Sequence, residues 1–352
     1  MRLIEQVWFQ SHPAKLLLVP ILLPISALFW CISTLRRAFF AAGIQTQVDT
    51  GLPVIVVGNI GVGGNGKTPT VLALIELCQD QGLKPGVISR GYGSKAPYYP
   101  YLLDAEDAEL TAELAGDEPY LIAQRAKTPV VIGADRVADV ALLKAQGCNI
   151  VIADDGLQHY RLARQHEIIV VDGKRLFGNG LLLPAGPLRE GIWRLSGSFQ
   201  ALTPTVIING EISSLSKLPT ECLTNALQMS LNAQSVVNLK TGERVTISQF
   251  ISEHQSINAL AGIGDPNRFF TTLTQLGFSL EKQQGFVDHH NFSAQDIASF
   301  TPDIPLLMTE KDAVKCASFA NNNCWYLPVD AKFSDKDQQS LIKVIQKLTP
   351  AR

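Results

Sequence analysis

Short apolar runs recur along the chain from residue 54 and alternate with stretches of helical periodicity. Each run is rich in β-branched residues and has almost no polar position, which is typical of strands covered on both faces. The order strand, helix, strand predicts a doubly wound, mostly parallel α/β sheet that binds ligands at the carboxyl ends of its strands. The predicted strands are 54–57, 86–89, 129–132, 150–153 and 168–171, and the predicted helices are 70–81, 105–125 with a break at Gly116, and 134–146.

The pattern becomes polar and rich in turns from residue 204 to residue 249, and it returns to α/β texture from residue 258. Thr241 and Gly242 predict a hairpin within the polar stretch. Beyond it we expect strands at 257–264, 306–309 and 324–329, and helices at 266–275 and 338–348. The predicted organisation is an apolar N-terminal segment (1–45), a larger α/β domain (46–210), a ribbon-like linker (211–255) and a smaller C-terminal α/β domain (256–352).

Residues 16–32 form an almost wholly apolar segment of the N-terminal region. Its 17 residues include Pro20 and Pro24 and lie at the short limit for a helix that spans a bilayer. A signal peptide would need a small-residue cleavage site and would export the glycine-rich segment at 61–68 to a compartment without ATP, so we do not expect one. We expect a membrane-surface helix with Trp30 and the pair Arg36 and Arg37 near the headgroups, and a buried packing helix is the alternative.

The charge balance bears on nucleic-acid binding, and the cysteines bear on the compartment of the protein. Lys and Arg total 30 against 32 Asp and Glu, so the net charge of −2 predicts no nucleic-acid partner. The six cysteines are scattered, with no C-x-x-C pair and no histidine at zinc spacing. This pattern predicts reduced thiols in a cytosolic compartment.

A glycine-rich segment follows the first predicted strand and opens the next helix. Residues 61–68 fit the P-loop pattern G-x-x-x-x-G-K-[ST] at every fixed position. Backbone N–H groups of such a loop bind phosphate oxygens, while Lys67 reaches the terminal phosphates and Thr68 offers its hydroxyl to Mg²⁺. The predicted nucleotide-binding residues are Gly61, Val62, Gly63, Gly64, Asn65, Gly66, Lys67 and Thr68.

A pair of carboxylates, Asp154 and Asp155, ends the strand predicted at 150–153. Parallel strands bring these side chains to the same sheet edge as the P-loop. Adjacent carboxylates repel each other unless a cation lies nearby, so we expect at least one of them to hold Mg²⁺. The fold class is therefore a P-loop NTPase fold with a second, smaller α/β domain and an N-terminal apolar membrane-associating helix.

The P-loop alone leaves three functional classes open. A GTPase needs N-K-x-D or T-K-x-D, and in Thr309-Glu310-Lys311-Asp312 the lysine stands one place too late. A partitioning ATPase of the K-G-G-x-G-K-T type would carry a lysine where Val62 stands. The third class transfers phosphate to a small acceptor and needs an acidic base and basic acceptor contacts.

Seven short blocks occur along the chain in this order: GNIGVGGNGKTP, SRGYG, GDEP, DDGLQH, PAGPLRE, DHHNF and TEKD. In these blocks and their order the chain resembles tetraacyldisaccharide 4'-kinase, the lipid A 4'-kinase of Gram-negative bacteria. The resemblance runs from the apolar N-terminal segment to near residue 315. It implies ATP and Mg²⁺, a two-lobed fold related to P-loop switch ATPases, and peripheral attachment to the cytoplasmic face of the inner membrane. It also implies phosphorylation of the 4'-hydroxyl of a tetraacylated glucosamine disaccharide 1-phosphate.

The resemblance assigns Asp117 as the base that takes the hydroxyl proton and His289 as its partner. The planar guanidinium of Arg189 is suited to neutralise charge on the transferred phosphoryl group. From the residues alone, Asp117 is first an N-cap of the following helix. His290 stands beside His289, and only the resemblance chooses between them. The alternative for Arg189 is an ion pair with the adjacent Glu190 at the protein surface.

Further polar residues of the same blocks are candidates for substrate contact or for support of the metal. Arg90 and Tyr92 follow a strand end near the P-loop, and Glu118 neighbours the proposed base. The TEKD block receives no role. A partner-stimulated switch ATPase and a kinase for a soluble acceptor remain the rival hypotheses. The substrate candidates are Arg90, Tyr92, Glu118, Gln158, His159 and Glu190.

Overall fold

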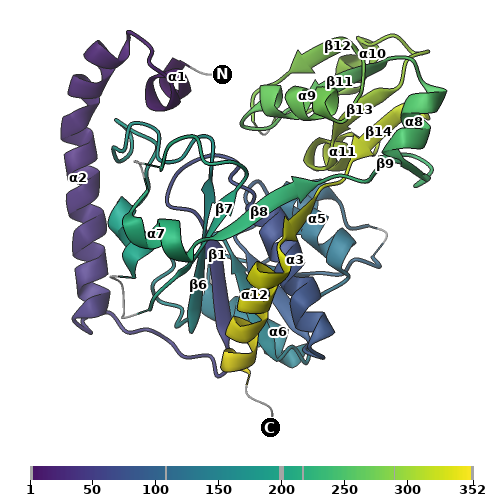
Figure 1. Cartoon of the computed structure of the whole chain (residues 1–352). Helices are drawn as coiled ribbons and strands as arrows, with labels where there is room; N and C mark the ends of the chain where they lie inside the picture. The colour runs from purple at the N-terminus through teal and green to yellow at the C-terminus, as the bar shows by residue number, and fades with distance from the viewer. Residues whose placement is uncertain (1–2, 108, 198–201, 216–217, 289, 350–352) are drawn as a thin grey trace.

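Two α/β lobes and a long N-terminal helix make up the structure (Figure 1). The computed structural model describes residues 3–349 except 108, 198–201, 216–217 and 289. The N-terminal helices are α1 (Leu3–Phe9) and α2 (Lys15–Ala41).

A nine-stranded sheet forms the first lobe, with helices on both of its faces. Its helices are α3 (Lys67–Asp80), α4 (Ala112–Ala115), α5 (Asp117–Ala126), α6 (Arg136–Ala145), α7 (Thr220–Asn225), α12 (Asp335–Leu348) and a 3₁₀ turn η1 (Ile192–Ser196). Its strands are β1 (Val54–Gly58), β2 (Pro85–Ser89), β3 (Tyr101–Leu103), β4 (Val130–Ile132), β5 (Ile150–Asp154), β6 (His166–Asp172), β7 (Thr205–Asn209), β8 (Leu227–Asn232) and β15 (Asp330–Phe333).

The strand order β15-β8-β7-β6-β1-β5-β2-β4-β3 places the P-loop strand β1 at the centre of this sheet. All neighbours pair in parallel except β3 with β4 and β15 with β8. Alternate side chains of β1 enter two cores: Ile55 and Val57 pack with α3, α5 and α12, whereas Val54 and Val56 pack with α6. The predicted doubly wound α/β fold is confirmed.

A six-stranded sheet of order β10-β9-β14-β13-β11-β12 forms the second lobe. Its helices are α8 (Ile247–Glu253), α9 (Pro266–Gln275), α10 (Ala294–Ala298) and α11 (Glu310–Cys316). Its strands are β9 (Ser235–Asn238), β10 (Arg244–Thr246), β11 (Ile257–Ala261), β12 (Leu280–Gly285), β13 (Leu306–Thr309) and β14 (Cys324–Leu327).

The predicted linker over 211–255 is wrong as a separate unit, because its strands belong to the two sheets. β8 pairs with β7 in the first lobe, and β9 and β10 form the predicted hairpin at the edge of the second. β15 and α12 return to the first lobe, so the predicted C-terminal domain ends at β14. Along β8, buried Leu227 and Met229 alternate with exposed residues, and this alternation gives the polar texture of a half-buried strand.

The helix predicted at 105–125 is also shorter than expected, because its first residues form turns. The side chains of Asp104 and Asp107 accept hydrogen bonds from the backbone N–H groups of Glu106 and Glu109, both at 2.9 Å. Such turns compete with helix formation. Helical structure begins only at α4, which the side chain of Thr111 caps.

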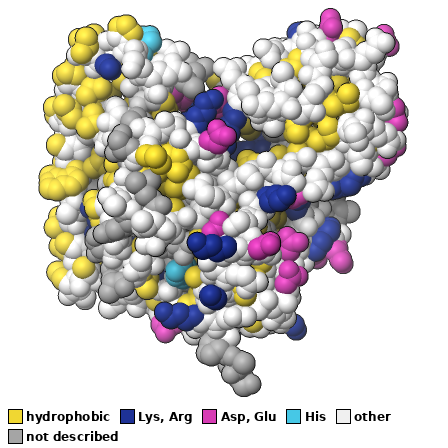
Figure 2. Space-filling view, viewed as in Figure 1, with side chains coloured by type: hydrophobic (Ala, Val, Ile, Leu, Met, Phe, Trp, Pro, Cys, Tyr) yellow, Lys and Arg dark blue, Asp and Glu magenta, His cyan; other side chains and the backbone are white. Residues whose placement is uncertain are grey.

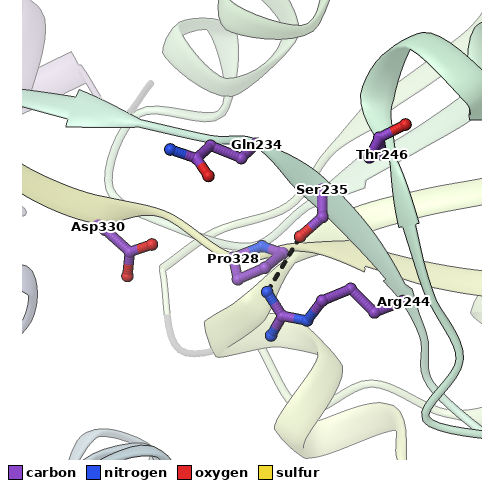
Figure 3. Close-up of a pocket in the computed structure, with 6 residues that line it drawn as sticks. All are labelled: Gln234, Ser235, Arg244, Thr246, Pro328 and Asp330. Atoms are coloured by element: carbon purple, nitrogen blue, oxygen red, sulfur yellow. Dashed lines mark hydrogen bonds between the residues drawn. The ribbon is translucent and has the colours of Figure 1, made fainter.

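The chain crosses between the lobes twice, between β8 and β9 and between β14 and β15 (Figure 1). A cavity of about 330 Å³ lies at these crossings, and the Arg244 guanidinium donates a 3.0 Å hydrogen bond to the Ser235 hydroxyl beside it (Figure 3). The lobes are thus joined here by two short segments around a hollow rather than by a shared core. The cavity is lined by Gln234, Ser235, Arg244, Thr246, Pro328 and Asp330.

The apolar N-terminal helix α2 is longer than the predicted 16–32, since it continues through both prolines for 27 residues. By length and composition it could cross a membrane: its most apolar stretch has a mean hydropathy of 2.3, and only 6% of that stretch is buried. Apolar side chains cover the side of the molecule where α2 lies (Figure 2). The alternative of a buried packing helix is therefore wrong.

Candidate active site

The P-loop connects β1 to α3 at the carboxyl edge of the first sheet, as the sequence predicts. Gly63 and Gly66 have φ values of +110° and +94°, which strongly favour glycine. A Cβ at Gly66 would also lie 2.6 Å from the Asn209 amide nitrogen. Gly66 occupies the N-cap position of α3 without a side-chain cap. The N–H groups of the first turn can therefore bind an anion.

Lys67, Asp155 and Arg189 form a charged cluster beside this loop. The Arg189 guanidinium makes two hydrogen bonds to the Asp155 carboxylate, at 2.8 and 3.0 Å. The Lys67 ammonium lies 3.7 Å from the same carboxylate and 3.2 Å from the Asn59 side-chain oxygen. Burial acts to raise the pKa of Asp155, but Lys67 and Arg189 outweigh it and hold this pKa at about 2. The Asp155 carboxylate is therefore ionised and paired.

Asp154 is buried, and its environment fits a divalent cation. Its Oδ1 atom has no hydrogen-bond partner, and its Oδ2 atom accepts a 3.4 Å hydrogen bond from Ser89. Burial and then the nearby Glu118 carboxylate raise the pKa of Asp154 to about 7. A metal ion would offset both effects. Among the described residues no group of three or more His, Cys, Asp or Glu could hold a metal. A Mg²⁺ ion at Asp154 would therefore need further oxygen ligands, such as water and phosphate oxygens.

Asp117 and Glu118 begin α5 and meet two lysines of the second lobe. The Asp117 carboxylate lies 3.3 Å from the Lys315 ammonium, and the Glu118 carboxylate lies 3.0 Å from the Lys311 ammonium. Gly116, with φ of +85°, takes the N-cap position, so the prediction that Asp117 is the cap is wrong. The two lobes together therefore form this acidic end of the site.

The TEKD block, to which the sequence assigned no role, makes this contact between the lobes. Thr309 caps α11 by accepting a hydrogen bond from the Asp312 N–H group. The Asp312 carboxylate accepts a 2.9 Å hydrogen bond from the Gly262 N–H group, which fixes the helix to β11. Lys311 then points to Glu118 and lies 3.9 Å from Asp288. His289, the predicted partner of Asp117, lies outside the described residues.

Lys315 was missed by the sequence analysis. It stands one helical turn after Lys311, on the same face of α11. The spacing of four residues indicates that Lys311 and Lys315 share one face of a helix. Nothing in the sequence indicated that this face would contact Asp117.

Glu190 and Gln158 support the site from within the first lobe. Glu190 is only 2% exposed, and its two oxygens accept hydrogen bonds from Gln158 at 2.6 Å and Arg194 at 3.2 Å. Arg194 also pairs with buried Glu167. The predicted substrate contact of Glu190 is therefore wrong, and so is the alternative of a surface pair between Arg189 and Glu190.

Arg90, Tyr92 and His159 lie at a more open and cationic part of the site. Arg90 and Tyr92 are exposed, whereas His159 is half-buried. Burial and then the positive charges of nearby arginines lower the pKa of His159 to about 4. The imidazole is therefore neutral near pH 7, in surroundings that favour an anion. The arginines responsible are Arg136, Arg164, Arg90 and Arg36.

A P-loop at the carboxyl edge of a doubly wound sheet, with an acid pair that a second lobe completes, defines a two-lobed nucleotide-dependent phosphotransferase. The sequence profile described as "Tetraacyldisaccharide-1-P 4'-kinase" matches residues 18–349, and the chain belongs to this family. The resemblance drawn from the sequence blocks is thereby confirmed.

Relatives support the assignment over almost the whole chain. The tetraacyldisaccharide 4'-kinase of Colwellia psychrerythraea is 59% identical over 342 residues, which cover 97% of this chain and 96% of that protein. The enzyme of the same name from Vibrio vulnificus is 46% identical, with 99% and 97% covered. The solved structure of LpxK from Aquifex aeolicus in complex with ATP superposes with a TM-score of 0.75 at 28% identity, covering 94% of this chain and 99% of that one.

We expect Arg194→Met to lower the free energy of unfolding by about 3–5 kcal/mol, because buried Glu190 loses its paired cation and Glu167 keeps only Arg164. Urea unfolding in detergent measures the loss. Arg161→Met is the matched control, since Arg161 is 60% exposed and pairs with Asp135 at the surface. The control should cost less than about 1 kcal/mol. Equal small losses in both variants would contradict a structural role for the buried network.

Proposed function

We propose that this chain transfers the γ-phosphoryl group of MgATP to the 4'-hydroxyl of tetraacyldisaccharide 1-phosphate in lipid A biosynthesis. The observation that carries the proposal is the acid pair of Asp117 and Glu118, which two lysines from the other lobe hold at the sheet edge that bears the P-loop. A phosphotransferase needs a base placed for the acceptor hydroxyl, which a simple nucleotide switch does not require.

The first lobe supplies the groups that bind the nucleotide. The N–H groups of the P-loop and the first turn of α3 bind the phosphates, and Lys67 adds a positive charge. Asp154 and Thr68 would hold Mg²⁺, and the bidentate contact of Asp155 with Arg189 supports this choice of carboxylate. A Mg²⁺ ion held there would supply positive charge that stabilises the transferred phosphoryl group.

A cavity of about 430 Å³ beside the P-loop suits the adenosine part of ATP. Met229 lines it and also touches the P-loop helix, because its sulfur accepts a 3.3 Å hydrogen bond from the Thr70 hydroxyl. The cavity lies along β8 and at the ends of β7 and β15, whereas Asp154 ends β5 on the opposite side of β1. The nucleotide would then run across the P-loop toward the acid pair.

Asp117 is the proposed base, with His289 as its proposed partner. The Lys315 ammonium at 3.3 Å orients the Asp117 carboxylate, and Lys311 does the same for Glu118. In-line transfer then requires Asp117 to take the hydroxyl proton while Lys67 and Arg189 stabilise charge on the transferred group. Arg189 would have to share its guanidinium between Asp155 and a phosphate oxygen.

The acceptor headgroup is proposed to lie near Arg90, Tyr92 and His159. Several guanidinium groups surround the neutral His159 imidazole, and this environment suits the 1-phosphate of the acceptor. Tyr92 is 72% exposed and offers a ring for sugar contact. Gln158 would act only indirectly, since its amide group donates to Glu190.

The chain is proposed to work on the cytoplasmic face of the inner membrane, with α2 lying against the bilayer. Contacts with the first lobe are spread along this helix: Ser26 is buried against it, and Arg36 and Arg37 lie over the rings of Tyr160 and Trp193 at 5.7 and 4.8 Å. Only the outer face of α2 is then available to lipid. This arrangement supports peripheral binding rather than a free transmembrane span.

Label from γ-labelled ATP should appear in detergent-dispersed tetraacyldisaccharide 1-phosphate with the wild-type chain. Lys67→Ala and Asp117→Asn should each reduce this transfer by about 10²-fold or more, because they remove phosphate and proton contacts of the transition state. Thin-layer separation of lipid and free phosphate measures the label. Glu113→Gln is the control, since Glu113 is exposed and forms an ion pair with exposed Lys95.

The rival classes give different results in the same assay. If label appears only as free phosphate, and the rate of its release does not depend on lipid, the chain is a switch ATPase and the kinase assignment fails. Equal transfer to a deacylated disaccharide would indicate a kinase for a soluble acceptor.

Replacing Leu17, Ile21 and Leu28 together by serine should raise the apparent KM for the lipid acceptor by about tenfold, because these side chains are 67%, 60% and 61% exposed on α2 and would lose contact with lipid. The KM for ATP should stay within about twofold of wild type. Steady-state kinetics in mixed micelles measures both constants. Leu215→Ser is the control, since Leu215 is 60% exposed outside α2. A KM for lipid equal to that of the control would refute the membrane role.

A further inference from the structure

The loop at 181–190 lies between the N-terminal helices and the P-loop and is hydrogen-bonded to both. Two hydrogen bonds within the loop stabilise its conformation. The Leu183 N–H group donates to the Leu188 carbonyl at 2.8 Å, and the Gly186 N–H group donates to the Leu182 carbonyl at 2.9 Å. The loop also carries Arg189, which contacts Asp155. Its position therefore sets the position of that guanidinium.

On one side, the N-terminal helices insert polar groups into this loop. Ser26 is the only buried residue of α2. Its hydroxyl donates to the Leu182 carbonyl at 3.0 Å and accepts from the Ala185 N–H group at 2.9 Å. From α1, the Trp8 indole donates to the Pro184 carbonyl at 3.0 Å.

On the other side, the same loop supports the start of the P-loop. The Val62 N–H group donates to the Pro187 carbonyl at 2.9 Å, and the Arg189 N–H group donates to the Ile60 carbonyl at 2.7 Å. Gly61 and Leu188 form an antiparallel bridge. The first residues of the phosphate-binding loop are thus paired like a strand with the segment that Ser26 holds.

We infer that Ser26 is a positioning residue for phosphoryl transfer, which acts through the loop at 181–190 on the P-loop and on Arg189. The N-terminal helices then have a second task beside contact with lipid: they hold the nucleotide site in its working geometry. The inference rests on the proposed function only for the role of Arg189 in transfer. Its effect on nucleotide binding follows from the P-loop contacts alone.

The coupling depends on the buried Ser26 hydroxyl, which hydrogen-bonds to two backbone groups of the loop at 181–190. Without it, the Ala185 N–H group loses its partner beneath a helix that shields it from water, and the Leu182 carbonyl keeps only the Gly186 N–H group. The loop must then shift to find other partners. Because its opposite edge is paired with residues 60–62, this shift reaches the P-loop.

The test measures binding of a fluorescent ATP analogue to the full chain in detergent, without acceptor, and then kcat and KM in the labelled-ATP assay. Ser26→Ala should weaken ATP binding by about fivefold to tenfold and lower kcat by a similar factor, as expected for buried hydrogen bonds. The KM for lipid should change by less than about twofold. Ser26→Thr, which keeps the hydroxyl, should recover most of the loss.

Ser33→Ala is the matched control, since the Ser33 hydroxyl donates to the Trp30 carbonyl of its own helix. Trp8→Phe tests the same loop from α1 and should give the same pattern, so the inference stays testable if Ser26→Ala does not fold. ATP binding equal to that of Ser33→Ala in both variants would overturn the inference. A defect confined to the KM for lipid would also overturn it. Failure of lipid phosphorylation by the wild type would instead overturn the proposed function, because ATP binding is measured without acceptor.

Discussion

The contact of Arg189 with Asp155 and Asn59 is the interaction on which the rest of the site depends. It joins three segments that are far apart in the sequence: the end of β1, the acidic end of β5 and the loop at 181–190. With the guanidinium in place, Asp155 is neutralised by partners within the protein, and Asp154 retains an oxygen without a partner. This division of roles between adjacent carboxylates leaves one of them available for a cation.

The two lobes build the remainder of the site through charge. Hollowed space separates them on the face seen in Figure 2, and Lys, Arg, Asp and Glu side chains gather there. Partly buried pairs of this kind are screened less by salt than exposed ones, and they fix orientation as well as distance. The acid pair at the start of α5 is therefore held in place only when the second lobe is docked. Among the described residues, ion pairs between the lobes include Arg125–Glu310, Arg175–Asp265, Arg268–Asp172, Lys311–Glu118 and Lys315–Asp117.

The sequence predicted well those features that local pattern encodes. The continuous apolar runs located β1, β2, β4, β5 and β6 to within two residues at each end, and α9 begins and ends at the predicted residues. The P-loop and the carboxylates after β5 followed from motif and strand order. The outer strands were harder to predict. The half-buried pattern of β8, which is second from the edge of its sheet, does not encode which sheet the strand joins.

Tertiary contacts account for the site features that the sequence did not reveal. The sequence around Glu190 does not indicate that this carboxylate is buried and paired with Arg194. Lys315 meets its partner Asp117 only because the two lobes are in contact. Ser26 looked like an ordinary small residue in an apolar helix, and only the fold shows its hydroxyl between Leu182 and Ala185. The role of His289 stays a prediction.

The central claim is that the second lobe completes the acidic end of the site, and single-turnover transfer from bound ATP to lipid tests it most directly in Lys311→Met. The account predicts transfer slowed by about 10²-fold with ATP binding near that of wild type, because Glu118 loses the cation that orients it. Lys282→Met, which removes an exposed lysine bonded to the Ser299 carbonyl in the same lobe, should leave the rate unchanged. A wild-type rate in Lys311→Met would contradict the account.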